Sequence, residues 1–205
     1  MRGDAVAFLV TPTKWDDAMV VTAGVLLAAG GGTRFAGPDH KLRADAAGRP
    51  LVADALDALA GSGLPLLVVV TGAVDLDDLL PAGAVSIANP AWERGQATSL
   101  ATAVAWARPR DIEAIVVGLG DQPGVTAESW TAVAAESATP IAIATYGGRR
   151  GHPVRLAREV WDRLPTEGDA GARALIRSTP ALVTEVPCIG DAVDIDTLED
   201  LARWR

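Results

Sequence analysis

The stretch LLAAGGGTRF, residues 26–35, joins an apolar run to three consecutive glycines, with an arginine at position 34. Glycine tolerates positive φ and lets backbone N–H groups approach phosphate oxygens closely. Arg34 can bind phosphate through a fork of hydrogen bonds, and Lys41 can add a point charge. A tight strand-to-helix turn without a ligand is the alternative, and the two cations argue against it. The stretch therefore predicts a strand that ends in an anion-binding loop.

The rest of the chain alternates between two patterns. Nearly continuous apolar runs, typical of strands covered on both faces, occur at Ala23–Ala28, Pro65–Thr71, Ala84–Ala88, Ala114–Leu119 and Pro140–Thr145. Apolar residues at helical spacing occur between them, at Leu51–Ala60, Gln96–Ala107 and Thr126–Ser137. This alternation predicts an α/β fold, a three-layer α/β/α sandwich with a mostly parallel, Rossmann-like sheet.

Length and composition bound the organisation and the partners. The 205 residues suit one domain, which we assign to residues 19–205, and residues 1–18 are expected to form a poorly ordered extension before Met19. The net charge of -8 and the dispersed arginines argue against nucleic acid as a partner. No apolar run approaches the ~20 residues that span a bilayer, and no signal peptide is recognisable, so a cytoplasmic protein without a membrane partner is expected.

Polar, glycine-rich segments follow several of the predicted strands. They are residues 30–34, 89–90 and 120–123, and further on residues 147–153 and 191–196. In open α/β sheets, ligands bind outside the carboxyl ends of the strands. We therefore expect these segments to gather around one site at that edge of the sheet.

Two widespread phosphate-binding motifs do not match this sequence. A G-x-x-x-x-G-K-[ST] loop is absent, because Lys41 follows His40 and precedes Leu42. The dinucleotide pattern G-x-G-x-x-G fails because Phe35 stands at its last position. The second predicted strand also ends in Thr71–Gly72 instead of the acid that a ribose requires.

A third pattern fits better. LLAAGGGTRFAGPDHKL resembles the signature L-A-A-G-x-G-x-R-x-G-x-x-K of nucleotidyltransferases, with Lys41 slightly beyond its commonest position. Five further motifs follow in the family's order: NPAWERGQATSL (89–100), GDQPG (120–124), RGHPV (150–154), GDAGAR (168–173) and DIDTLEDL (194–201). From about Val20 to the C-terminus, the chain is similar to molybdenum cofactor cytidylyltransferases and their relatives, although Leu198 stands where proline is common.

The resemblance implies a reaction and its participants. A terminal phosphate of the acceptor would attack the α-phosphorus of a nucleoside triphosphate, with loss of pyrophosphate and with Mg²⁺ as the cofactor. The implied partners are CTP, a molybdopterin-type phosphorylated acceptor and, as a further candidate, a molybdoenzyme that receives the product. Arg34, Lys41 and Asp121 are the implied catalytic residues.

Three carboxylates are candidates for the two protein ligands of the metal. Asp121 follows a buried strand and is the best candidate, with an Asx-type turn as its structural alternative. Asp194 and Asp196 project to the same face of extended chain, and the family pattern favours Asp196 as the second ligand. Asp196 could instead cap the last helix, with Glu199 completing a capping box.

The resemblance also assigns residues to the two substrates. The nucleotide would contact the loop, through Ala28, Ala29, Gly30, Gly31, Gly32, Thr33, Arg34 and Lys41, and the start of a helix, through Gly95, Gln96 and Ser99. The form LAAG favours CTP, because a methyl group at Ala29 restricts the room for guanine. The acceptor would contact Arg150, His152, Pro153, Asp169 and Arg173, with Trp92 as a stacking candidate.

Other functions fit part of this pattern. The same fold could act on another phosphorylated acceptor, as 2-phospholactate guanylyltransferases and sugar-phosphate nucleotidyltransferases do. A chaperone that binds and delivers a cofactor without catalysis is a different class. Asp121 discriminates the two classes, because a chaperone could lose this carboxylate and still bind its cargo.

Overall fold

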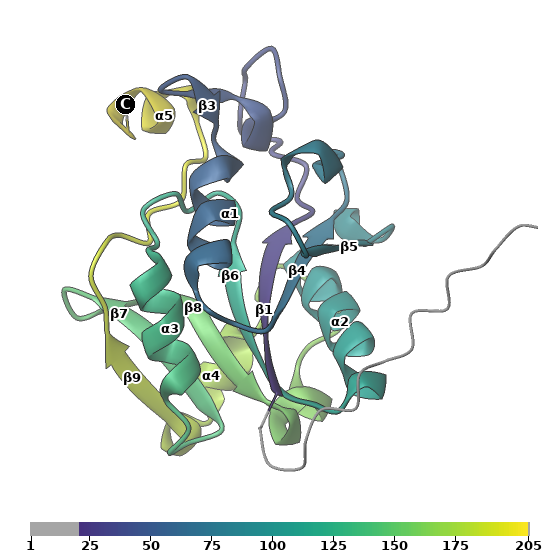
Figure 1. The fold of residues 1–205 in the computed structure, drawn as a ribbon, viewed down its shortest axis with the longest axis vertical. Coiled ribbons are helices and arrows are strands. Elements are labelled where there is room, and N and C mark those ends of the chain that lie inside the picture. Colours follow the sequence, from purple (N-terminus) through teal and green to yellow (C-terminus); the bar gives the residue numbers. More distant parts are fainter. Residues whose placement is uncertain (1–20, 205) are drawn as a thin grey trace, which may run out of the picture.

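The computed structural model describes residues 21–204, so the predicted extension at residues 1–18 and Met19 lie outside the described part of the chain. A seven-stranded sheet in the order β5-β4-β1-β6-β8-β7-β9 forms its centre (Figure 1). The strands are β1 (Val21–Ala28), β4 (Leu66–Thr71), β5 (Val85–Ala88), β6 (Ile112–Leu119), β7 (Ile141–Tyr146), β8 (Arg149–Ala157) and β9 (Val183–Pro187). A small hairpin pairs β2 (Asp45–Ala46) with β3 (Arg49–Pro50).

Strand direction divides the sheet into two parts. β5, β4, β1 and β6 run parallel to one another, and β1 lies between β4 and β6. β8 runs antiparallel to both β6 and β7, and β7 pairs in parallel with β9. The prediction of a mostly parallel sheet is confirmed, with β8 as the antiparallel strand.

Helices cover both faces of the sheet, as the apolar runs require. Alternate residues of β1 enter different clusters: Val25 and Leu27 pack with α2 (Gln96–Ala107) and α4 (Arg173–Ser178), whereas Leu26 and Ala28 pack with α1 (Val52–Gly61) and α3 (Ala127–Ala135). Because successive side chains of a strand point to opposite faces, the two clusters lie on opposite sides of the sheet. The predicted three-layer sandwich is confirmed.

A third, smaller cluster positions the C-terminal segment. Phe35, Leu51, Ile195 and Leu201 are buried together, and Leu201 belongs to the last helix, α5 (Leu198–Trp204). In Figure 1, α5 lies beside the β2–β3 hairpin at one end of the molecule. This packing fastens the segment before α5 onto the residues that follow the glycine loop.

The predicted strands and helices match the structure to within a few residues, but two strands of the main sheet and the β2–β3 hairpin were not predicted. Residues 149–153, interpreted as part of a loop, belong to β8, and β9 has no counterpart among the predicted strands. Within residues 21–204, no helix has both the length and the apolar character that crossing a membrane would require.

Candidate active site

The carboxyl ends of β1 and β6 meet at a pocket of about 700 Å³, which we call the glycine-loop pocket. The hydrogen bond from Gly120 N–H to the Leu27 carbonyl, 3.0 Å long, joins the ends of these two strands. Gly31 and Asp121 both line the pocket, as the motif order predicts for neighbouring strand ends. The other predicted nucleotide-binding residues that line it are Ala28, Ala29, Gly30, Gly32, Thr33, Arg34, Lys41, Gly95, Gln96 and Ser99.

The loop needs its glycines for two different reasons. A Cβ on Gly31 would come within 2.6 Å of the Trp92 ring, so this glycine makes room for the tryptophan. Gly32 has a φ of +60°, which strains other residues, and a Cβ there would lie 3.0 Å from the Cβ of Lys41. Trp92, the predicted stacking candidate, therefore packs against the loop and lines the same pocket as the predicted nucleotide-binding residues.

Lys41 connects the loop to two carboxylates from distant parts of the chain. Its Nζ donates to Asp121 Oδ2 at 2.7 Å and to Asp196 Oδ1 at 2.9 Å. Burial of this side chain opposes its charge, but the two carboxylates outweigh that effect and raise the pKa of Lys41 above its usual value. Arg34, which is exposed, pairs with the other oxygen of Asp196 at 2.9 Å.

His40 holds the turn that carries Lys41, a role that the sequence did not indicate. Its Nδ1 accepts the Leu42 N–H at 3.2 Å, and its Nε2 donates to the Gly30 carbonyl at 3.0 Å. Burial is the main reason that the pKa of His40 is lowered, so the ring favours the neutral form with a proton on Nε2 alone. His40 therefore links the start of the glycine loop to the lysine.

The backbone explains how Asp196 reaches Lys41. The Ile195 N–H donates to the Asp121 carbonyl at 3.0 Å, and the buried Ile195 side chain anchors the segment. The alternative in which Asp196 caps α5 with Glu199 is wrong. Thr197 Oγ1 accepts the Asp200 N–H at 3.1 Å, while the Asp200 carboxylate accepts the Thr197 N–H at 2.9 Å, so these two residues form the capping box.

The charged side chains that line the glycine-loop pocket indicate whether a cation could bind there. Five acidic side chains line it against three basic ones, so acids predominate where an anion is expected to bind. Because one ammonium reaches both Asp121 and Asp196, their oxygens converge on one point. Oxygen ligands of this kind suit Mg²⁺ or Mn²⁺, which would also reduce the repulsion of a phosphate chain. The donor set therefore fits a divalent cation.

The start of α2 forms the opposite wall. Asn89, which is buried, donates through Nδ2 to Thr98 Oγ1 at 2.8 Å and to Ser99 Oγ at 3.0 Å, so it orients the hydroxyl of Ser99. Gly95 has a φ of +102°, and a Cβ there would collide with the backbone of Gly168. The loop that begins at Gly168 is thus held against the first turn of α2.

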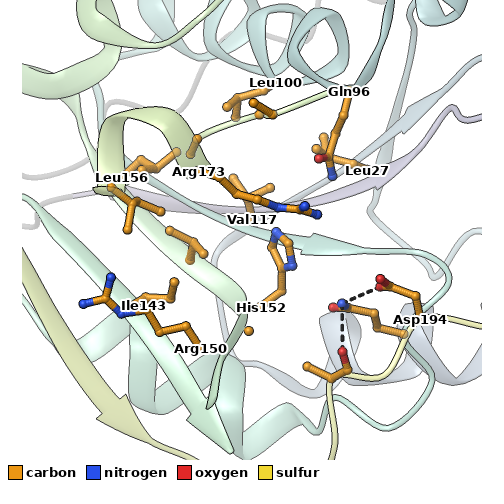
Figure 2. Close-up of a pocket in the computed structure, with 18 of the residues that line it drawn as sticks. Leu27, Gln96, Leu100, Val117, Ile143, Arg150, His152, Leu156, Arg173 and Asp194 are labelled. Carbon is orange, nitrogen blue, oxygen red and sulfur yellow. Dashed lines mark hydrogen bonds between the residues drawn. The ribbon is translucent and has the colours of Figure 1, made fainter. Parts of the chain in front are cut away.

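A second pocket, of about 380 Å³, adjoins the first, and we call it the His152 pocket (Figure 2). Leu27, Gln96, Arg173 and Asp194 line both pockets and form their common boundary. Figure 2 shows the imidazole of His152 pointing toward the guanidinium of Arg173, with aliphatic side chains beside them. The two pockets are therefore adjacent chambers of one site.

His152 reaches this pocket because β8 is irregular. The register with β7 shifts between Ile143, which faces Val154, and Ala144, which faces Gly151, so His152 and Pro153 form a bulge. Bulges re-aim side chains beside functional sites. Burial, with Arg173 nearby, lowers the pKa of His152 to about 4, so the ring is neutral at pH 7.

The structure does not bring all the predicted acceptor residues together. Arg150, His152 and Arg173 line the His152 pocket, but Arg150 also pairs with Glu185 of β9 at 2.8 Å. Asp169 lines only the glycine-loop pocket, and the buried Pro153 lines neither pocket.

Two residues of the site were not assigned to the acceptor from the sequence. Gln122 Nε2 donates to Asp194 Oδ1 at 2.7 Å, and both residues line the His152 pocket. Burial, together with the nearby charge of Asp121, raises the pKa of Asp194. Of the two candidates for the second metal ligand, Asp196 bonds to Lys41, whereas Asp194 lies at the boundary of the two pockets.

Solved structures share this fold. Rv0371c from Mycobacterium tuberculosis H37Rv is 28% identical, with a TM-score of 0.74 over 90% of this chain and 97% of its own. A homologue of it from Mycobacterium sp. strain JC1 is 29% identical, with a TM-score of 0.75 over 91% and 96% of the two chains. A nucleotidyl transferase from Methanothermobacter thermautotroptrophicus is 20% identical, with a TM-score of 0.76 over 89% and 95%.

Rv0371c has also been solved in complex with manganese. None of the curated proteins matches this sequence significantly. The family model of the MobA-like NTP transferase domain matches residues 24–183, which include the glycine loop, Lys41, Asp121 and His152. The chain therefore belongs to the family of MobA-like NTP transferase domains.

Proposed function

We propose that this protein transfers CMP from CTP to the phosphate of a molybdopterin-type acceptor and releases pyrophosphate. Its family makes nucleotidyl transfer the class of activity. The observation that carries the proposal is the convergence of Lys41, Asp121 and Asp196 beside the glycine loop. Such chemistry depends mainly on in-line positioning and on neutralising charge.

Within this proposal, the glycine-loop pocket binds CTP. The N–H groups of the loop and the guanidinium of Arg34 bind phosphate oxygens, and Lys41 neutralises charge that develops on them. Asp121 and Asp196 would hold the divalent cation, which would supply positive charge to offset the charge of the phosphates. The manganese complex of Rv0371c supports a divalent cation in proteins of this fold.

Ala29 lines the glycine-loop pocket, and its methyl group favours cytosine over a larger purine base. This residue is buried, and a Cβ on Gly72 would lie only 2.8 Å from its methyl group. The methyl group therefore has little freedom to move for a larger purine, which supports the preference for CTP that the LAAG form implies.

The acceptor is assigned to the His152 pocket. At pH 7 its neutral imidazole can exchange hydrogen bonds but adds no charge, so Arg173 supplies the positive charge at the boundary with the nucleotide. A phosphate is already ionised near neutrality and needs no strong base to become a nucleophile. His152 therefore orients the acceptor in this mechanism.

The test offers each of the four nucleoside triphosphates with Mg²⁺ and purified molybdopterin, and follows pyrophosphate release and the mass of the product. CTP is expected to give the fastest release and a cytidylylated product. Release with GTP alone would overturn the cytidine assignment. No release with any nucleotide would exclude molybdopterin as the acceptor.

A further inference from the structure

The inner part of the His152 pocket is aliphatic, in contrast to its charged boundary. The side chains that form this part come from α2, β6, β7, β8 and α4: Leu100, Val117, Ile143, Val154, Leu156 and Ile176. They belong to the core that packs α2 and α4 onto the sheet. The cavity is thus an opening in a packed core, and the sheet holds its shape.

Several polar groups of the pocket lie at its boundary with the glycine-loop pocket, whereas Arg150 and Arg177 line the His152 pocket alone. Arg173 and Asp194 line both chambers, and Gln122 is bonded to Asp194. Figure 2 shows Arg173, His152 and Asp194 toward one side of the cavity, with Leu156, Ile143 and Arg150 on the other. An acceptor phosphate that faces the nucleotide would therefore leave the remainder of the acceptor among aliphatic groups.

We propose that the acceptor carries, beyond its phosphate, an uncharged group with apolar faces, either an alkyl group or a flat ring, and that this pocket discriminates against sugar phosphates. The inference rests on the proposed transfer to a phosphorylated acceptor, but not on molybdopterin itself. A flat heterocycle fits such a pocket because the two faces of its ring are apolar. A sugar does not fit, because hydroxyl groups project from all its sides.

The energetics favour this choice. Each hydroxyl that is buried without a hydrogen-bond partner weakens binding. Apolar surface that is buried against the same side chains strengthens it. The cavity volume of about 380 Å³ lies toward the lower end of the usual range for small-molecule sites, so it suits one compact group.

The experiment uses simple phosphate monoesters of equal charge. Binding of benzyl phosphate, n-hexyl phosphate, ribose 5-phosphate and glucose 1-phosphate to the full-length protein is measured by calorimetry in the presence of Mg²⁺. Benzyl phosphate is expected to bind at least about tenfold more tightly than either sugar phosphate. Equal affinities, tighter binding of a sugar phosphate, or no binding of any monoester would overturn the inference.

A matched pair of variants locates the preference. Ile176→Asn places an amide among the aliphatic side chains and is expected to abolish the tenfold preference, whereas Ile176→Val is expected to retain most of it. CTP affinity reports on folding, because Ile176 lines the His152 pocket and not the glycine-loop pocket. If Ile176→Asn binds CTP normally and keeps the preference for benzyl phosphate, the aliphatic group is not the selector.

The outcome is separable from that of the proposed function. If molybdopterin supports no pyrophosphate release but benzyl phosphate is preferred in the wild type and not in Ile176→Asn, the inference stands with a different acceptor. If molybdopterin is turned over and the monoesters show no preference, the proposed function stands and the inference fails.

Discussion

The two chambers of the site are built from different materials. The glycine-loop pocket consists largely of backbone at strand ends and of charged side chains, and Lys41 joins two of its carboxylates. The His152 pocket consists largely of aliphatic side chains from several elements, with Arg173 at its mouth. In the proposed function, short local motifs would therefore bind the phosphates, whereas selection of the acceptor would depend on packing between distant segments.

Substitutions in the two chambers are expected to have different consequences. Changes at the glycine-loop pocket are expected to reduce turnover with every acceptor, because they affect the common phosphate chemistry. Changes at the His152 pocket are expected to alter which acceptors bind, while CTP affinity is retained. The following variants test this division.

The largest effect is expected for Asp121→Asn. The substitution removes a charge that pairs with Lys41 at 2.7 Å and that would ligate the cation. We expect kcat to fall about a thousandfold, equivalent to about 4 kcal/mol of transition-state stabilisation. Steady-state pyrophosphate release, measured with each acceptor, provides the check.

Asp57→Asn is the matched control for Asp121→Asn. Asp57 lies on α1, where its exposed carboxylate pairs with Arg49 at 2.6 Å. Its loss is expected to change kcat by less than about twofold, because exposed ion pairs contribute little. A mild loss of turnover in Asp121→Asn, comparable to that of the control, would contradict the catalytic assignment.

The second effect is a decrease in the free energy of unfolding of the protein in acid, caused by protonation of His152. In the unfolded chain His152 takes up a proton as the pH falls below about 6.5, whereas in the folded chain its pKa is about 4. The stability that neutral His152 contributes is therefore present above pH 6.5 and lost as the pH falls toward 4. Between pH 7 and pH 5 the loss amounts to about 2 kcal/mol.

Urea unfolding at pH 7 and pH 5 measures this loss. The decrease in the free energy of unfolding is expected to be about 2 kcal/mol greater for the wild type than for His152→Gln, which carries no titratable group at this position. His40 is present in both proteins, so its contribution cancels. Equal decreases would mean that His152 titrates normally in the folded protein.

The third effect tests whether Lys41 competes with the cation. Its ammonium lies between Asp121 and Asp196, at the point where their oxygens converge. Lys41→Met keeps the length of the side chain and removes its charge, so Mn²⁺ is expected to bind the free protein about tenfold more tightly, while turnover falls. Electron paramagnetic resonance measures free Mn²⁺ without nucleotide.

Arg34→Met is the control for this measurement. Arg34 is largely exposed and, within residues 21–204, pairs with Asp196 but not with Asp121, so its loss is expected to change Mn²⁺ affinity less than the loss of Lys41. If Lys41→Met leaves the Mn²⁺ affinity of the free protein unchanged, the two carboxylates do not form the cation site.

The same division explains what could be predicted from the sequence. β1, β4, β5 and β6 were predicted because each is a short, nearly continuous apolar run, and the glycine loop was predicted because its chemistry lies within a few adjacent residues. β8 was missed because Gly151, His152 and Pro153 read as a loop. The bulge at this point accommodates a proline, which cannot donate a ladder hydrogen bond.

Distant contacts account for the remaining failures in the site. The distinction between Asp194 and Asp196 depends on how Ile195 is anchored and on which acidic residue Gln122 meets, and neither contact has a local signal. The capping box at Thr197 and Asp200 was one residue away from the predicted one. His40 acts through its hydrogen bond to the Gly30 carbonyl, which no local pattern predicts. Its position beside Lys41 could nevertheless have suggested a supporting role.

The smallest effect is expected at Arg150, which the sequence grouped with Arg173 as an acceptor residue. Arg150 donates to Glu185 at 2.8 Å, and this exposed pair already uses part of its hydrogen-bonding capacity. Arg173 lines both chambers and lies beside neutral His152. Arg173→Ala is therefore expected to raise the acceptor KM about tenfold, whereas Arg150→Ala raises it less than about threefold.

Glu185→Ala separates the two possible roles of Arg150. Releasing Arg150 from its partner frees the guanidinium to reach an anionic acceptor, so the acceptor KM is expected to stay the same or fall slightly. Initial rates at saturating CTP measure all three variants. A tenfold rise in KM for Arg150→Ala, with little change for Arg173→Ala, would place the acceptor's charge nearer the β9 edge of the sheet and away from the nucleotide. Of the two arginines, only Arg173 borders both chambers.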